Sequence, residues 1–196
     1  MIRSLIAGAL ALLYVVLWVW WGGDGTPLSR EEGEAFVAEL HRIHGDMGAN
    51  PEFYPNLAAW IARDDGAEFV MVNLETFKDD GNAAAEADRR YARGIVPLLF
   101  AHGSAPIFIG YPSGLLFGEK ARNVDRVALV RYRSLRDFLK VVTHPAMEEL
   151  TVFKWASLSR TEIFPVRTFW ALNAFRALTG ALFLALILIA LFLRRS

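Results

Sequence analysis

The chain has 196 residues, of which 54% are hydrophobic, and its 21 basic residues balance 21 acidic ones. This length fits one ordinary domain with additional segments, and the apolar fraction exceeds the usual soluble range, so apolar residues should be concentrated in particular stretches. The balanced charge argues against a nucleic-acid partner, which requires a basic surface, and the absence of cysteine excludes disulfides and zinc–thiolate sites.

Residues 1–23 predict a transmembrane helix. Residues 4–23 carry no charge and are long enough to cross a hydrocarbon core of about 30 Å. The alternative is a cleaved signal peptide, because residues 1–3 resemble a short basic leader. A retained anchor is favoured, since the apolar run is long, lacks a small-residue cleavage site and ends in bulky tryptophans: Trp18, Trp20 and Trp21.

Residues 24–68 are interpreted as a linker and a helical extension. Ser29 and Glu32 match a capping box, in which each side chain accepts a hydrogen bond from the other residue's backbone amide. The helix that follows has an apolar face, formed by Phe36, Val37, Leu40, Ile43 and Met47. Residues 45–55 break this helix, and residues 56–63 predict another short helical turn.

His41 and His44 lie three residues apart on this helix and are the candidate metal ligands. Metal sites need three or four ligands, and no further ligand can be identified along the sequence. We therefore favour two solvated histidines over a metal site, and we expect no metal and no cofactor.

Residues 69–166 predict an α+β domain. Stretches rich in β-forming residues predict four strands, at residues 69–75, 105–111, 125–133 and 159–164. A helix is expected over residues 82–101, with Pro97 inside it and Gly103 just after its end. Ser134 is expected to cap a second helix, which is interrupted at His144 and Pro145.

This order of strand, helix, strand, strand, helix, strand is that of a ferredoxin-like βαββαβ fold, in which two helices cover one face of an antiparallel sheet. The other face of such a sheet is open, so Met71, Ile107 or Ile109 are expected to need a partner. Residues 112–123 predict a loop whose apolar tip, residues 115–117, could cover a cleft or touch lipid.

Residues 167–196 predict a second transmembrane helix with a short basic tail. Residues 177–193 are uncharged and slightly short for a span, and residues 171–176 complete it. A stripe of small residues would let another helix approach closely, formed by Ala177, Gly180, Ala181 and Ala185. The partner would be the first span, a second copy or a different membrane protein; the alternative is that alanine is simply common in apolar helices.

The positive-inside rule predicts the orientation of the two spans. Arg3, Arg194 and Arg195 lie at the outer ends of the spans, so both termini are expected in the cytoplasm. The central domain would then be exported across the inner membrane, into the periplasm of a bacterium. An aromatic belt is expected at the exported face, formed by Trp18, Trp20, Trp21 and Trp170.

Four short motifs within residues 69–165 are spaced in a recognisable way. They are VMVNLETFKD at 70–79, the tyrosine, PLL and HG of 91–103, VALVRYRS at 127–134 and FLKVVTHPAMEE at 138–149. With them, the region resembles an uncharacterised family, the domain-of-unknown-function family number thirteen-thirty of the dimeric α/β-barrel superfamily, here flanked by two transmembrane helices. The sequence departs from the pattern at Ser104, Arg133 and His144.

The resemblance implies a ferredoxin-like protomer whose open sheet face packs on a second copy. Relatives in the superfamily include heme-degrading and quinone-forming monooxygenases, muconolactone-type isomerases and peroxidases. The resemblance transfers no catalytic residue, because none is established in the family.

Asn73, Glu75, Arg131 and His102 are the polar residues expected to face the cleft between the sheet and the second copy. As a catalytic set they could perform acid–base chemistry, because a guanidinium keeps a carboxylate ionised and histidine titrates near neutrality. Structural roles are favoured: Asn73 satisfies a backbone group, Glu75 pairs with Arg131 at a sheet edge, and His102 caps a helix.

The sequence contains no phosphate loop, nucleophile elbow, HExxH motif or heme-attachment motif. It therefore favours a membrane-anchored, exported association module with lipid and protein partners, either a homodimer or an accessory subunit of a larger membrane complex. The alternative is an enzyme or binding protein for a lipid-soluble or aromatic ligand such as a quinone.

Overall fold

The computed structural model describes residues 2–23, 25–46, 50–119, 121–168 and 175–192. The chain forms two compact units, one of residues 1–24 with 168–196 and one of residues 25–167. The described residues form seven α-helices and four β-strands, and we take each unit by itself.

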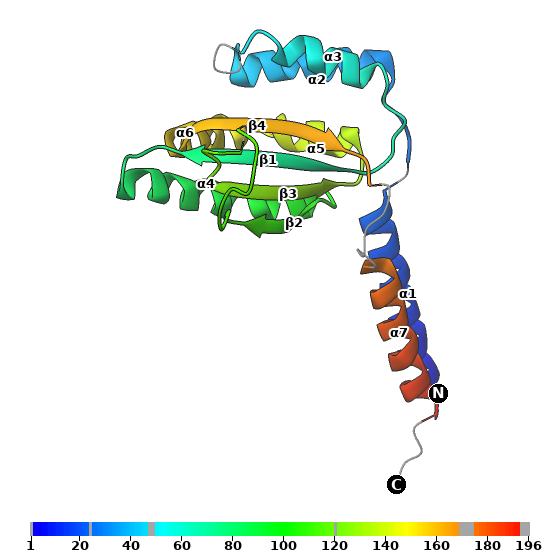
Figure 1. Ribbon diagram of the computed structural model, residues 1–196. Helices are drawn as coiled ribbons and strands as arrows, with labels where there is room; N and C mark the ends of the chain where they lie inside the picture. The colour runs from blue at the N-terminus through cyan, green and yellow to red at the C-terminus, as the bar shows by residue number, and fades with distance from the viewer. Residues whose placement is uncertain (1, 24, 47–49, 120, 169–174, 193–196) are drawn as a thin grey trace. The chain divides into compact units, whose positions relative to one another are not determined.

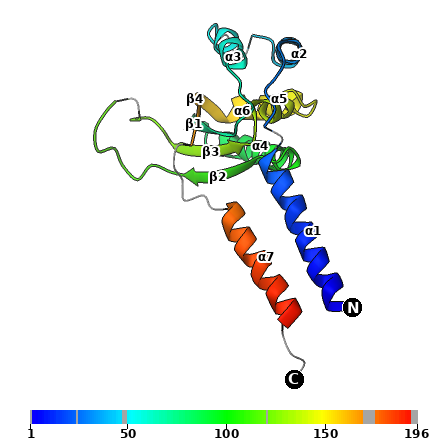
Figure 2. The same cartoon turned by 90° about the vertical axis from the view of Figure 1, so that its right-hand side faces the viewer.

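The first unit contains two helices, α1 (Ile2–Gly22) and α7 (Phe175–Phe192). They run side by side in opposite directions, as Figures 1 and 2 both show. A Cβ added at Gly180 of α7 would lie 2.7 Å from the Tyr14 hydroxyl of α1. By length and composition, α1 could cross a membrane, a property that it shares with signal sequences.

The second unit is built on a four-stranded antiparallel sheet of β1 (Phe69–Phe77), β2 (Ala105–Gly110), β3 (Arg126–Tyr132) and β4 (Leu158–Val166). The strand order is β2-β3-β1-β4, so β2 and β4 are the edges. Each edge strand contains a proline, Pro106 in β2 and Pro165 in β4. The predicted α+β class and the four antiparallel strands are confirmed.

Three helices cover one face of this sheet, α4 (Asn82–Ala101), α5 (Leu135–Val142) and α6 (Met147–Ser157) (Figures 1 and 2). The helix predicted after Ser134 is thus divided in two, with the break at His144 and Pro145 as expected. Helices α4 and α6 pack closely, since a Cβ at Gly94 would lie 2.2 Å from a methyl carbon of Leu150. The core between sheet and helices contains Phe69, Met71, Ile95, Leu99, Tyr132, Leu135, Leu139, Val141, Met147 and Leu150.

The opposite sheet face presents the other set of alternating side chains. It includes Val72 and Leu74 of β1 and the more exposed Phe108 and Phe164 of the edge strands, which are 52% and 43% exposed. Met71 does not belong to this face. We expected it to need a partner outside the domain, but it lies in the helix-side core and is 4% exposed.

A pair of helices, α2 (Arg30–His44) and α3 (Phe53–Ile61), forms the predicted extension beside β4 and α6 (Figure 1). The capping box at Ser29 and Glu32 is present, with both of its hydrogen bonds. The side chains of Leu40 and Leu57 are buried in the same core as the sheet, so the pair belongs to the domain. Met47, expected on the apolar face of α2, lies outside the described residues.

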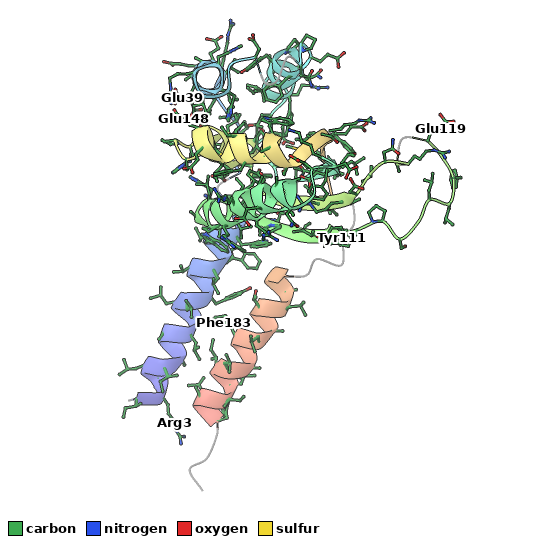
Figure 3. The ribbon with its side chains drawn as sticks, turned by 90° about the vertical axis from the view of Figure 1, so that its left-hand side faces the viewer. Arg3, Glu39, Tyr111, Glu119, Glu148 and Phe183 are labelled. Atoms are coloured by element: carbon green, nitrogen blue, oxygen red, sulfur yellow. The ribbon has the colours of Figure 1, made fainter. Side chains whose placement is uncertain are left out.

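The segment between β2 and β3 extends away from the sheet, and Figure 3 labels Tyr111 and Glu119 along it. Its predicted apolar tip is exposed: Leu116 is 98% exposed and Phe117 is 91% exposed. Among the described residues, this tip therefore covers no cleft.

Candidate functional site

A cavity of about 650 Å³ lies between the helix-covered face of the sheet and helices α2 to α6. Every strand contributes to its lining, which is mostly apolar. Its volume is in the range of protein sites that enclose small organic molecules. The α2–α3 pair contributes to its wall together with the three helices that cover the sheet.

One end of the cavity has a polar floor. Because side chains alternate along a strand, Asn73 and Glu75 point to the same side of β1 as the core residue Met71. In the sheet register, Asn73 lies between Ala128 and Ile163, and Glu75 lies between Arg126 and Thr161. The small Ala128 leaves space beside the asparagine.

A buried cluster of charges holds this end together. Arg126 Nε donates to Glu75 Oε2 at 2.6 Å, and the two terminal nitrogens donate to the two oxygens of Asp88, each at 2.8 Å. Such bidentate, charge-assisted hydrogen bonds are strong and fix geometry. Burial lowers the pKa of Arg126, but its hydrogen bonds to Asp88 and Glu75 outweigh this effect and raise the pKa above its usual value.

Three polar atoms of the floor retain unused hydrogen-bonding capacity. Asn73 Nδ2 donates to the carbonyls of Met71 and Ala128 at 3.4 and 3.3 Å, but no described residue donates to Asn73 Oδ1. Likewise, no described residue donates to Glu75 Oε1. Thr161 Oγ1 is buried without a hydrogen-bond partner among the described residues.

The roof over this end comes from α4 and α6. Lys154 Nζ lies 5.7 Å from the ring centre of Tyr91 and 5.9 Å from that of Trp155, distances suited to cation–π attraction. At the other end, Tyr132 is buried, and burial raises the pKa of its hydroxyl, so it stays protonated at neutral pH. The end at Asn73 and Glu75 therefore combines a polar floor with aromatic walls.

The four residues proposed as a catalytic set do not form one cluster. Asn73 and Glu75 line the cavity, whereas Arg131 pairs in register with Val70 and so points to the opposite face. The expected pairing of Glu75 with Arg131 is wrong: Glu75 binds Arg126, and Arg131 donates to Glu68 and to the Gly103 carbonyl.

His102 lies apart from the cavity, at the C-terminal cap of α4, where its backbone amide donates to the carbonyls of Leu99 and Phe100. Burial lowers the pKa of its imidazole below the usual value. Its position agrees with the structural role that the sequence favoured.

The two candidate metal ligands face different neighbours. His41 stacks on the ring of Tyr54 with the ring centres 3.5 Å apart. His44 has Nε2 at 2.8 Å from the Val142 carbonyl and Nδ1 at 3.3 Å from the Thr151 hydroxyl. Within the described ranges, no group of three or more potential ligands could hold a metal.

The small residues of α7 are divided between two sides of the helix. Gly180 faces α1, where Phe183 also packs on Tyr14 with ring centres 5.6 Å apart. The three alanines of the stripe are exposed: Ala177, Ala181 and Ala185. Among the predicted belt residues, the ring of Trp18 lies 5.9 Å from Tyr14, and the rings of Trp20 and Trp21 lie 6.0 Å apart; Trp170 lies outside the described residues.

No family model and no curated protein matches this chain. Solved structures do match. The crystal structure of RPA0582, a protein of unknown function from Rhodopseudomonas palustris, is 20% identical with a TM-score of 0.54, covering 60% of this chain and 94% of that one. Its methylated form is 21% identical with a TM-score of 0.55, covering 61% and 93%. A protein from Arabidopsis thaliana, At3g17210, is 14% identical with a TM-score of 0.40, covering 53% and 97%.

At about one identical residue in five, the similarity to the Rhodopseudomonas protein concerns the fold alone. Assignment to the family of unknown function therefore stays a prediction.

Proposed function

We propose that residues 25–167 form a binding domain for a small, largely apolar molecule. The cavity of about 650 Å³ is the observation that carries this proposal. Apolar clefts and cavities with a few converging polar groups are typical ligand sites, and here those groups are Asn73, Glu75 and Thr161. This is the second of the two functions considered from the sequence, and the cavity favours it.

The strand order and antiparallel pairing support assigning the domain to the ferredoxin-like fold of the dimeric α/β-barrel superfamily. Because one fold hosts many functions, we rest the ligand proposal on the cavity and not on superfamily members.

The binding test uses the full chain in lipid nanodiscs, with titration calorimetry of apolar aromatic compounds and empty nanodiscs as the reference. Ala92 lines the cavity, so the larger side chain of Ala92→Leu should fill part of it. We expect binding to weaken at least about tenfold, which corresponds to a loss of about 1.4 kcal/mol in binding free energy. The matched control is Ala83→Leu, an exposed position on the same helix and outside the lining. Equal affinity in Ala92→Leu and the wild type would refute the proposal.

We further propose that two spans anchor the domain in the inner membrane, with both termini cytoplasmic and the domain periplasmic. The apolar α1, the uncharged residues 177–192 and the opposite directions of α1 and α7 support this topology. The chain contains no cysteine, so single cysteines can be labelled selectively. An impermeant maleimide should label Ser113→Cys in intact bacterial cells and Ser196→Cys only after permeabilisation; the reverse pattern would refute the orientation.

A second candidate function is association through the open sheet face, with a second copy as the partner. Phe108, Phe164 and Val166 support it, because they are 52%, 43% and 38% exposed on that face, and exposed apolar patches mark interaction sites. In detergent, Phe108→Asp should convert a dimer to a monomer in analytical ultracentrifugation, whereas Phe117→Asp on the loop should not. A monomeric wild-type protein would exclude homodimerisation and leave an accessory role with another membrane subunit.

A further inference from the structure

We infer that the ligand of the cavity carries a neutral hydroxyl group on an aromatic ring, and that this hydroxyl forms hydrogen bonds with the polar floor at Asn73, Glu75 and Thr161. The inference rests on the proposed binding function and narrows its ligand class. It starts from the hydrogen-bonding capacity that the floor leaves unused.

Two of the unused atoms can only accept. Both hydrogen bonds of the Asn73 amide nitrogen go to backbone carbonyls of the sheet, so its donors are occupied and its oxygen is available. One carboxylate oxygen of Glu75 accepts from Arg126, and no described residue donates to the other. The two residues are alternate positions on β1 and point to the same side of the sheet. A ligand group that binds these two oxygens must therefore donate.

The third atom, Thr161 Oγ1, can accept or donate and lies opposite Glu75 in the sheet register. It is buried without a partner among the described residues. Buried polar atoms in proteins nearly always have a hydrogen-bond partner, and Thr161 is part of the cavity lining. Because a water-sized molecule does not reach this oxygen, the Thr161 side chain must rotate for a ligand hydroxyl to supply the missing partner.

The charges of the cavity end favour a neutral donor. Glu75 and Asp88 contribute two negative charges, and Arg126 and Lys154 contribute two positive ones. A cationic amine would be repelled by the guanidinium and the ammonium group, and an anion would face two carboxylates and the acceptor oxygens. A hydroxyl donates to one of the acceptors and leaves this charge balance unchanged.

The rest of the lining favours an aromatic body. Tyr91 and Trp155 lie at the polar end, and the rings of Trp60 and Phe138 pack near each other further along, with centres 5.8 Å apart. Aromatic rings pack favourably in edge-to-face and offset arrangements, which such walls provide. The class that fits both ends of the cavity is a phenol with one or more further rings.

The test compares two probes of nearly equal size, 4-phenylphenol and its methyl ether 4-methoxybiphenyl, which cannot donate a hydrogen bond. Binding to the full chain in nanodiscs is measured by calorimetry against empty nanodiscs. We expect the phenol to bind about tenfold more tightly than the ether, because one or two hydrogen bonds usually contribute this difference in binding free energy.

Two variants test where the hydroxyl binds. Thr161→Val keeps the shape of the side chain and removes its hydroxyl, and Asn73→Ala removes the amide. Each should reduce the ratio of phenol affinity to ether affinity about threefold or more. Thr76→Val is the control, since Thr76 lies on β1 outside the lining and donates to the Asn123 carbonyl. Thermal melts of each variant verify folding.

The possible outcomes separate this inference from the function on which it rests. If both probes bind equally, the cavity binds aromatic molecules but does not select a hydroxyl, and the inference is wrong. A phenol preference that survives both variants also overturns it, because the hydroxyl is then recognised elsewhere. If neither probe binds, the proposed binding function fails as well.

Discussion

Replacing Arg126 with methionine tests whether the polar end of the cavity is dry and preorganised. The Arg126 side chain is 13% exposed, and its partners Glu75 and Asp88 are 5% and 20% exposed. The substitution keeps most of the apolar stem and leaves two carboxylates without a counter-charge. Removing one partner of a buried ion pair typically costs 3–5 kcal/mol, so we expect Arg126→Met to lower the free energy of unfolding by about 4 kcal/mol at pH 7.

Pulse proteolysis of the full chain in detergent across a urea series measures this loss. The triple variant with Glu75→Gln and Asp88→Asn should recover most of the stability, because it removes the uncompensated charges. Arg160→Met is the control, since the Arg160–Glu162 pair is largely exposed and such pairs contribute about 0–1 kcal/mol. If Arg126→Met lowers the free energy of unfolding no more than Arg160→Met does, water already screens the cluster and the polar end of the cavity is not dry.

Three further predictions concern other parts of the chain. Burial lowers the pKa of His102 in the folded protein. The stability that the neutral imidazole contributes is therefore present above the unfolded-state pKa of about 6.5 and is lost as the pH falls through the folded-state pKa. An NMR titration that places the folded-state pKa at or above about 6.5 would contradict this. Leu139→Ala, at 0% exposure, should cost about 2–5 kcal/mol, and Leu116→Ala, at 98% exposure, less than about 0.5 kcal/mol; equal losses would mean that the core is misplaced. Gly180→Leu should separate α7 from α1, because a Cβ there would lie 2.7 Å from the Tyr14 hydroxyl; we expect several-fold less disulfide cross-linking between cysteines introduced into the two helices, and an unchanged yield would refute this contact.

Local sequence signals predicted most of the element boundaries. The capping box at Ser29 and Glu32 depends on residues three apart, and the helix of residues 82–101 ends just before Gly103, whose φ of 64° suits a glycine. The break at His144 and Pro145 has the same local origin, since proline lacks the backbone N–H that a continuous helix needs.

The orientation of the sheet could not be predicted in the same way. Both sets of alternating side chains on β1 are rich in apolar residues, Phe69 and Met71 on one side and Val70 and Val72 on the other. Alternation therefore groups Asn73 with Met71 but does not say which group the helices cover. For this reason the sequence assigned these residues to the open face, and the structure assigns them to the core.

The site itself depends on contacts between distant segments. Glu75 finds its partner 51 positions away, at Arg126, and the sequence offered Arg131 as an equally good guanidinium. Side chains alternate between the two faces of a strand. Arg131 lies an odd number of positions after Arg126, which pairs in register with Glu75, so the two arginines point to opposite faces of the sheet. No local sequence pattern predicts the cavity, because its volume depends on how helices and strands from distant parts of the chain pack around it.

The prolines of the two edge strands restrict how copies of this domain could assemble. Pro106 and Pro165 lack the backbone N–H that an added strand would use, and proline on an edge strand is a common protection against edge-to-edge pairing. Edge-to-edge pairing of several copies into one continuous sheet is therefore unfavourable. Contact through the sheet face can instead be symmetric, and such a contact uses the same patch on both partners and stops at two copies. The edge prolines would therefore favour finite pairs over fibres.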